Sequence, residues 1–161
     1  MTDTENPRAG FAAIIGAPNA GKSTLVNRLT GTKVSIVTQK VQTTRFPVRG
    51  IAIEGEAQIV LVDTPGIFTP RRRLDRAMVA SAWGGASEAD VVVHLIDAAS
   101  HIASEGREGQ AADRRSAEDT GTIIAGLKAS GNQVILALNK IDGMRRDTLL
   151  ALSHAMFETG V

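Results

Sequence analysis

Short apolar runs alternate with amphipathic segments of helical length along most of the chain. Buried strands are predicted at residues 11–15, 91–96 and 134–138, and a β-hairpin at 48–53 and 58–62, around the turn-like Glu54-Gly55-Glu56. Helical periodicity covers residues 22–29, about 74–86, 116–129 and 147–159. Strands that alternate with helices predict an α/β fold with a mostly parallel sheet and helices on both faces.

Polar stretches separate these elements. Residues 1–9 form a disordered N-terminal tail in this interpretation, and residues 10–161 form one domain. Residues 34–45 are rich in threonine and indicate a mobile loop, and residues 98–115 are expected to be a surface loop. A further loop after Asp63 carries Arg71-Arg72-Arg73, a run that is more often simply solvated than a nucleic-acid site.

Composition removes several classes of function. With 43% hydrophobic and 22% charged residues the chain is typical of a globular protein. The absence of cysteine excludes disulfides, thiolate metal sites and cysteine nucleophiles. The net charge of +1 gives no general argument for nucleic acid or membrane. The apolar runs are too short to span a bilayer, and His94, His101 and His154 are too scattered to suggest a metal site.

A phosphate-binding pattern follows the first apolar run and opens the first helix. It matches G-x-x-x-x-G-K-[ST], in which backbone N–H groups and the helix N-terminus hold phosphate oxygens. The lysine of the pattern bridges phosphate oxygens, and the hydroxyl group of the serine or threonine that follows it is a ligand for Mg²⁺. The residues of this loop are Gly16, Ala17, Pro18, Asn19, Ala20, Gly21, Lys22 and Ser23.

A second segment, Asp63-Thr64-Pro65-Gly66, comes directly after a predicted strand. Because neighbouring parallel strands end at the same edge, Asp63 is expected near the phosphate loop, where its carboxylate holds Mg²⁺ through water. The Gly66 amide is expected to sense the γ-phosphate. This tetrapeptide is also an ordinary turn sequence, and its position after an apolar strand is what favours the functional interpretation.

A third segment, Asn139-Lys140-Ile141-Asp142, follows the last predicted strand. The Asp142 carboxylate can accept the N1–H and N2–H₂ donors that guanine presents side by side. Adenine lacks that pair of donors and would leave a carboxylate buried against it unpaired. Lys140 is expected to lay its stem over the base, and Asn139 to tie the segments together. The sequence therefore predicts selection of GTP over ATP.

With these segments in place, the chain resembles the Era family of translation-factor-class GTPases. The most specific mark is Gln42-Thr43-Thr44-Arg45 with its lead-in from Val34, and a second is Val62-Asp63-Thr64-Pro65-Gly66-Ile67. The resemblance implies a P-loop NTPase fold, an Era-like G domain, from about residue 10 to the end. It also implies Mg²⁺ as cofactor, GTP and GDP as ligands, and a molecular switch in small-subunit ribosome assembly.

The resemblance adds residue roles. Thr43 or Thr44 completes the Mg²⁺ shell with Ser23 and Asp63, and the sequence leaves open which threonine it is. Ile67 stands where Ras-type GTPases place the glutamine that orients water, so slow hydrolysis is expected. Asn19 is implied to help hold a potassium ion; alternatively it only shapes the loop. The expected catalytic set is Lys22, Asn19, Thr43, Thr44 and Gly66.

The family pattern continues beyond this chain, and this sets further expectations. A sixth strand, a Ser-Ala guanine-contacting loop, a closing helix and an RNA-binding KH domain are missing from the 161 residues. We therefore expect the chain as written to aggregate and to bind GDP weakly. The resemblance implies contact with small-subunit rRNA through the missing domain, and a cytoplasmic location with peripheral membrane association of the full-length protein. The alternatives are a tRNA-modifying or double-GTPase-type relative, and a non-catalytic GTP-binding fragment.

Overall fold

The computed structural model of the protein describes residues 8–37 and 44–161. Within them, five strands and five helices follow one another along the chain. The strands are β1 (Arg8–Ile15), β2 (Val48–Glu54), β3 (Ala57–Asp63), β4 (Val91–Asp97) and β5 (Val134–Asn139). The helices are α1 (Lys22–Thr30), α2 (Arg73–Ser87), α3 (Ala98–Glu105), α4 (Ala111–Ser130) and α5 (Arg146–Glu158).

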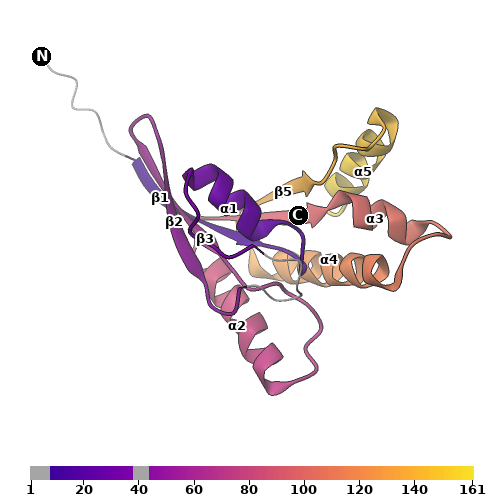
Figure 1. The fold of residues 1–161 in the computed structure, drawn as a ribbon, viewed down its shortest axis with the longest axis horizontal. Coiled ribbons are helices and arrows are strands. Elements are labelled where there is room, and N and C mark those ends of the chain that lie inside the picture. The colour runs from indigo at the N-terminus through magenta and orange to yellow at the C-terminus, as the bar shows by residue number, and fades with distance from the viewer. Residues whose placement is uncertain (1–7, 38–43) are drawn as a thin grey trace, which may run out of the picture.

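The strands form a single sheet in the order β2-β3-β1-β4-β5 (Figure 1). Only β2 runs antiparallel to its neighbour; β3, β1, β4 and β5 are parallel. The predicted α/β class and mostly parallel sheet are therefore confirmed. Because the parallel strands all end at one edge, the segments that follow β1, β3, β4 and β5 come together there.

Alternate residues of β1 face two separate cores. Ile14 packs with Val26 of α1 on one face of the sheet. Ile15 packs on the other face with Ala82 of α2 and Ile123 of α4. A further cluster on the side of α4 joins Ile96 of β4 to Leu152 and Met156 of α5. The sheet thus has α1 on one face, and α2, α4 and α5 on the other (Figure 1).

The predicted turns and helix ends are largely confirmed. The β2–β3 connection turns at Gly55, whose φ of 57° lies in the left-handed region that glycine adopts without strain. Gly31 and Gly131 end α1 and α4 in the same conformation. The bounds of the predicted strands and helices lie within five residues of the observed bounds.

The expectation of a surface loop at residues 98–115 is wrong. This segment contains α3 and the first turns of α4. Its polar composition was misleading because the polar residues lie on exposed faces and at helix starts. The Asp97 carboxylate accepts the Ser100 N–H at 2.9 Å and caps α3, and Asp113 accepts the Gln110 N–H at 2.9 Å at the start of α4. The isolated Ile102 packs with the α5 cluster and holds α3 in place.

Strand β5 is the outer strand on its side of the sheet in the described part of the chain. Its side chains are only partly buried, and Ile135 is 54% exposed. The expected sixth strand beside it and the weak GDP binding of the chain stay predictions. Of the tail expected at residues 1–9, Arg8 and Ala9 belong to β1, and residues 1–7 lie outside the described residues. Among the described residues, no helix combines the length and the apolar character that crossing a bilayer requires.

Candidate functional site

The phosphate loop, residues 16–23, connects the end of β1 to α1 and lies against the ends of two other strands. A Cβ at Gly16 would stand 2.4 Å from the carbonyl oxygen of Leu95 in β4, and one at Gly21 would stand 2.4 Å from the Asn139 side-chain amide. Gly21 also has a φ of 102°. Both glycines are therefore required by close packing of the loop, in addition to the expected approach of phosphates.

Lys22 is buried at the centre of this loop. Its Nζ donates hydrogen bonds to the carbonyl oxygens of Gly16 at 3.2 Å and Ala17 at 2.8 Å. Burial lowers the pKa of Lys22 to about 8, although the nearby Asp63 carboxylate opposes this shift. The ammonium is thus held at a fixed place with an incomplete set of partners, and an anion beside it would favour its charged form.

Three oxygen-bearing side chains from distant segments converge beside Lys22. The Ser23 hydroxyl donates to Asp63 Oδ2 at 2.6 Å, the Thr44 hydroxyl donates to the same oxygen at 3.2 Å, and the two hydroxyl oxygens lie 3.1 Å apart. Asp63 Oδ1 is buried and has no hydrogen-bond partner among the described residues. Hard oxygen ligands and an unpaired carboxylate oxygen fit the ligand preference of Mg²⁺. Ser23, Thr44 and Asp63 are therefore a suitable set to hold it.

The segment after Asp63 is fastened to the phosphate loop. The Thr64 hydroxyl donates to the Ile14 carbonyl at 2.8 Å, and the Ile67 N–H donates to the Gly16 carbonyl at 3.0 Å. A Cβ at Gly66 would stand 3.0 Å from Pro18. Pro65 is fully buried and Ile67 is 1% exposed. The Ile67 side chain packs in the core on the side of α2 and α4, so it cannot reach a water molecule beside the phosphates.

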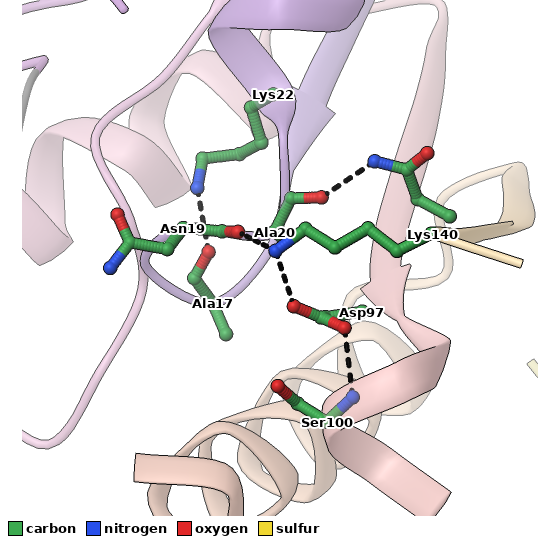
Figure 2. A network of polar contacts seen from close by, with 8 residues as sticks. Ala17, Asn19, Ala20, Lys22, Asp97, Ser100 and Lys140 are labelled. Atoms are coloured by element: carbon green, nitrogen blue, oxygen red, sulfur yellow. Dashed lines mark hydrogen bonds and ion pairs between the residues drawn. The ribbon is translucent and has the colours of Figure 1, made fainter. Parts of the chain in front are cut away.

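The segment after β5 is tied to the same loop from the other side. Asn139 donates from its side-chain amide to the Ala20 carbonyl at 2.9 Å. The Lys140 ammonium donates to the Asn19 carbonyl at 2.7 Å and to Asp97 Oδ2 at 2.6 Å. Figure 2 shows Lys140 reaching across to Asn19, whose own side chain points away from it. Asn139 thus links the segment after β5 to the phosphate loop, and its role toward a nucleotide stays a prediction.

The rest of this segment is open. Ile141 is 39% exposed, and the Asp142 carboxylate is exposed as well. Asp142 follows two residues after Lys140, and its carboxylate makes no hydrogen bond or ion pair with the described residues. The arrangement therefore combines a buried cluster around Lys22 with an exposed carboxylate at Asp142.

Comparison with known proteins identifies the family of the chain. The family model of the 50S ribosome-binding GTPases matches residues 11–140, from Phe11 within β1 to Lys140, and hence most of the site. The chain belongs to this GTPase family.

Within the GTPase family the similarity is to Era proteins. The GTPase Era of Caulobacter vibrioides (strain NA1000 / CB15N) is 68% identical over 162 residues, which are 100% of this chain and 51% of that protein. The GTPase Era of Maricaulis maris (strain MCS10) is 57% identical over 161 residues, again 100% of this chain and 51% of that protein. The resemblance to the Era family is confirmed, and the chain spans about half the length of the curated relatives it matches.

Solved Era structures share the fold. A crystal structure of Era in complex with MgGDPNP and nucleotides 1506–1542 of 16S ribosomal RNA is 38% identical, with a TM-score of 0.74, and the match covers 95% of this chain and 48% of that chain. A crystal structure of an Aquifex aeolicus Era variant bound to GDP·AlF₄⁻ is also 38% identical, with a TM-score of 0.73. That match covers 94% of this chain and 47% of that chain. The expected Era-like G-domain fold is confirmed.

The candidate site unites most of the residues that the sequence predicts for it. The phosphate loop, the segment from Asp63 to Ile67, and Asn139 with Lys140 are joined by direct hydrogen bonds. Of the two candidate threonines, Thr44 lies beside Ser23 and Asp63, whereas Thr43 lies outside the described residues. The nucleotide, Mg²⁺ and K⁺ roles of these residues stay predictions.

Sequence reasoning missed one residue that contacts the candidate site, Asp97. It ends β4 opposite Asn139 of β5, and its carboxylate pairs with Lys140. A usable signal was present, because Asp97 follows an apolar strand just as Asp63 does. Its partner lies 43 residues away, so only the pairing of β4 with β5 shows the contact. In the described ranges, no three histidine, aspartate or glutamate side chains gather into a group that could hold a metal ion.

Proposed function

We propose that the protein binds Mg²⁺·GTP, hydrolyses it slowly to GDP, and serves as a molecular switch in assembly of the small ribosomal subunit. The observation that carries this proposal is the convergence of Ser23, Thr44 and Asp63 beside the buried ammonium of Lys22. Asn139 and Lys140 supply the link from that cluster to the base end. The Era structure with MgGDPNP supports a magnesium nucleotide as the ligand.

In this function each part of the chain has a defined task. The backbone N–H groups of the phosphate loop and the Lys22 ammonium bind the β- and γ-phosphates. Ser23, Thr44 and Asp63 hold Mg²⁺, which neutralises charge on the phosphate oxygens when it is bound. The Gly66 amide senses the γ-phosphate. Asp142 accepts the guanine donors, while the Lys140 stem covers the base.

Slow turnover follows from the absence of a water-orienting side chain at Ile67, which is buried in the core. Asn19 is proposed to help hold K⁺ against the phosphates, where the cation supplies the positive charge that an arginine finger supplies elsewhere. The Asn19 side chain is exposed at the mouth of the loop, where an ion can approach it.

The ribosomal part of the proposal rests on the relatives. Small-subunit rRNA is proposed as the partner of the full-length protein because a solved Era holds a 16S rRNA fragment. No residue described here is assigned to that contact. A cytoplasmic location and peripheral membrane association likewise remain proposals based on the family. The whole-chain identity to Era proteins favours this function over that of tRNA-modifying or double-GTPase-type relatives.

The decisive measurement is phosphate release from GTP by the purified protein with Mg²⁺, in potassium and in sodium salts. We expect slow turnover in sodium and roughly tenfold faster turnover in potassium, with the gain lost in Asn19→Ala. Asn132→Ala, after α4 and away from the site, is the matched control and should keep the gain. Phosphate release absent in both salts, despite GTP binding, would identify a non-catalytic binding fragment. Equal rates in both salts would remove Asn19 from the mechanism.

A further inference from the structure

Asp97 occupies a junction between three segments. It is the last residue of β4 and the N-cap of α3, and it lies opposite Asn139 in the parallel pairing of β4 with β5. Its side chain is 7% exposed, so its charge needs a partner. Each carboxylate oxygen has one: Oδ1 accepts the Ser100 N–H at 2.9 Å, and Oδ2 accepts the Lys140 ammonium at 2.6 Å (Figure 2).

The Lys140 ammonium in turn bonds the Asn19 carbonyl in the phosphate loop. Lys140 and Asn19 have φ values of 59° and 62°, and within residues 8–37 and 44–161 they are the two non-glycine residues with positive φ. Such backbone conformations cost free energy and persist where surrounding contacts hold them. The chain of contacts from Asp97 through Lys140 to Asn19 therefore joins the two strained positions of the site.

We propose that Asp97 is a positioning residue of the nucleotide site. It holds the Lys140 ammonium against the Asn19 carbonyl, and thereby fixes the Lys140 stem and the phosphate loop relative to one another before the nucleotide arrives. A Lys140 that had only the Asn19 carbonyl as partner would be freer to swing into solvent, since its side chain is already 44% exposed. The inference deepens the proposed function, on which it rests.

A purely structural role must be separated from this one, because Asp97 also caps α3. Asp97→Asn makes the separation, since asparagine is as good an N-cap as aspartate but cannot form the ion pair. If Asp97 acts through Lys140, the substitution should weaken binding only while Lys140 is present. The four proteins of the test are the wild type, Asp97→Asn, Lys140→Met and the double variant.

The measurement is GDP affinity, by displacement of a fluorescent GDP analogue. We expect Asp97→Asn to weaken GDP binding about tenfold in the presence of Lys140, and less than about twofold in the Lys140→Met background. Asp113→Asn, which removes the same charge at the start of α4, should stay within twofold of the wild type. Equal losses in both backgrounds, or no loss with Lys140 present, would overturn the proposal.

A second readout needs no nucleotide, so that failure of the inference can be told from failure of the proposed function. In the nucleotide-free protein, amide hydrogen exchange in residues 16–23 should be faster in Asp97→Asn than in the wild type, by about tenfold. The double variant should exchange as fast as Lys140→Met alone. If the wild type binds no GDP but the four proteins still differ in exchange in this way, the proposed function is refuted and the positioning role is retained. Unchanged exchange in Asp97→Asn would refute the positioning role.

Discussion

The two ends of the site are built differently. At the phosphate end, Asp63 and Thr64 are fully buried and Lys22 is 7% exposed. Hydrogen bonds join the segment after β3 to Ile14 of β1 and to Gly16 of the phosphate loop. At the base end, Ile141 and Asp142 are exposed, and β5 before them is an edge strand of the sheet in the described part of the chain.

Under the proposed function, this difference divides the binding of the nucleotide between the two ends. The phosphate end is organised by the packing of the protein itself, so its groups lose little freedom when they meet a ligand. The base end gains its burial only from what docks against it. Substitutions at the phosphate end should therefore weaken nucleotide binding strongly, whichever base the nucleotide carries. Changes at the base end should be smaller and should depend on which base is offered.

The largest effect is expected at Lys22. Lys22→Met keeps most of the apolar stem but removes the ammonium, and should weaken GTP binding about a thousandfold, whichever purine the nucleotide carries. Competition with GTP and ITP measures this. Lys128→Met, an exposed lysine near the end of α4, is the matched control and should change neither affinity. A loss below tenfold, or one confined to guanine, would contradict the division between the two ends.

The same variant should stabilise the nucleotide-free protein. The pKa of Lys22 is lowered from 10.5 to about 8 by burial, so the charged form is disfavoured in the folded chain. Holding the charged lysine therefore lowers the free energy of unfolding. This loss is complete below pH 8 and disappears as the pH rises to 10.5, because between these two values the unfolded chain binds the proton and the folded chain does not. At pH 7, urea unfolding of Lys22→Met should therefore show a higher midpoint than that of the wild type.

A smaller and base-specific effect is expected at Asp142. Asp142→Asn replaces an acceptor of the guanine donors by an amide, and should weaken GDP about a hundredfold while favouring xanthosine diphosphate, which carries an oxygen in place of the amino group. Binding of the two diphosphates in competition measures the switch. Asp147→Asn, another exposed acid, should leave the preference unchanged. Since Asp142 is exposed, the unfolding free energy should move by less than about 0.5 kcal/mol. Retained preference for guanine would refute the assignment.

Local patterns were enough to predict which segments meet around Lys22. The loop at residues 16–23 and the segment after Asp63 are contiguous stretches at the ends of apolar strands, and strand ends meet at one edge in a parallel sheet. The contacts of Ile67 were harder to foresee. The sequence showed only that it lacks a polar atom, while the structure shows its side chain buried in the core and its N–H bonded to the Gly16 carbonyl.

The missed features depend on tertiary structure. The polar segment at residues 98–115 gave no strong periodicity, and its helices are fixed by the caps at Asp97 and Asp113 and by packing of Ile102. Asp97 meets Lys140 only because β4 and β5 are neighbours in register. The choice between Thr43 and Thr44 depends on how a loop folds back onto Asp63, and a pattern without periodicity does not encode that.

The smallest effect is expected behind the phosphate end, at His94. This residue lies on β4 opposite Ile15, is fully buried, and has no hydrogen-bond partner for either ring nitrogen among the described residues. Burial, reinforced by the Lys22 charge, lowers the pKa of His94 from 6.5 to about 4. Between these two values the unfolded chain binds a proton that the folded chain does not, so the stability should fall as pH falls below 6.5.

The comparison of wild type with His94→Leu isolates this contribution, because all other titrating groups are shared. Between pH 7 and pH 5, the wild type should lose about 2 kcal/mol more unfolding free energy than the variant, as measured by urea unfolding at both pH values. His154→Leu changes an exposed histidine on α5 and should keep the pH dependence of the wild type. Equal losses in the wild type and His94→Leu would show that His94 finds a proton-stabilising partner. The surroundings of His94 behind the phosphate loop would then accommodate a charged imidazole, despite its burial.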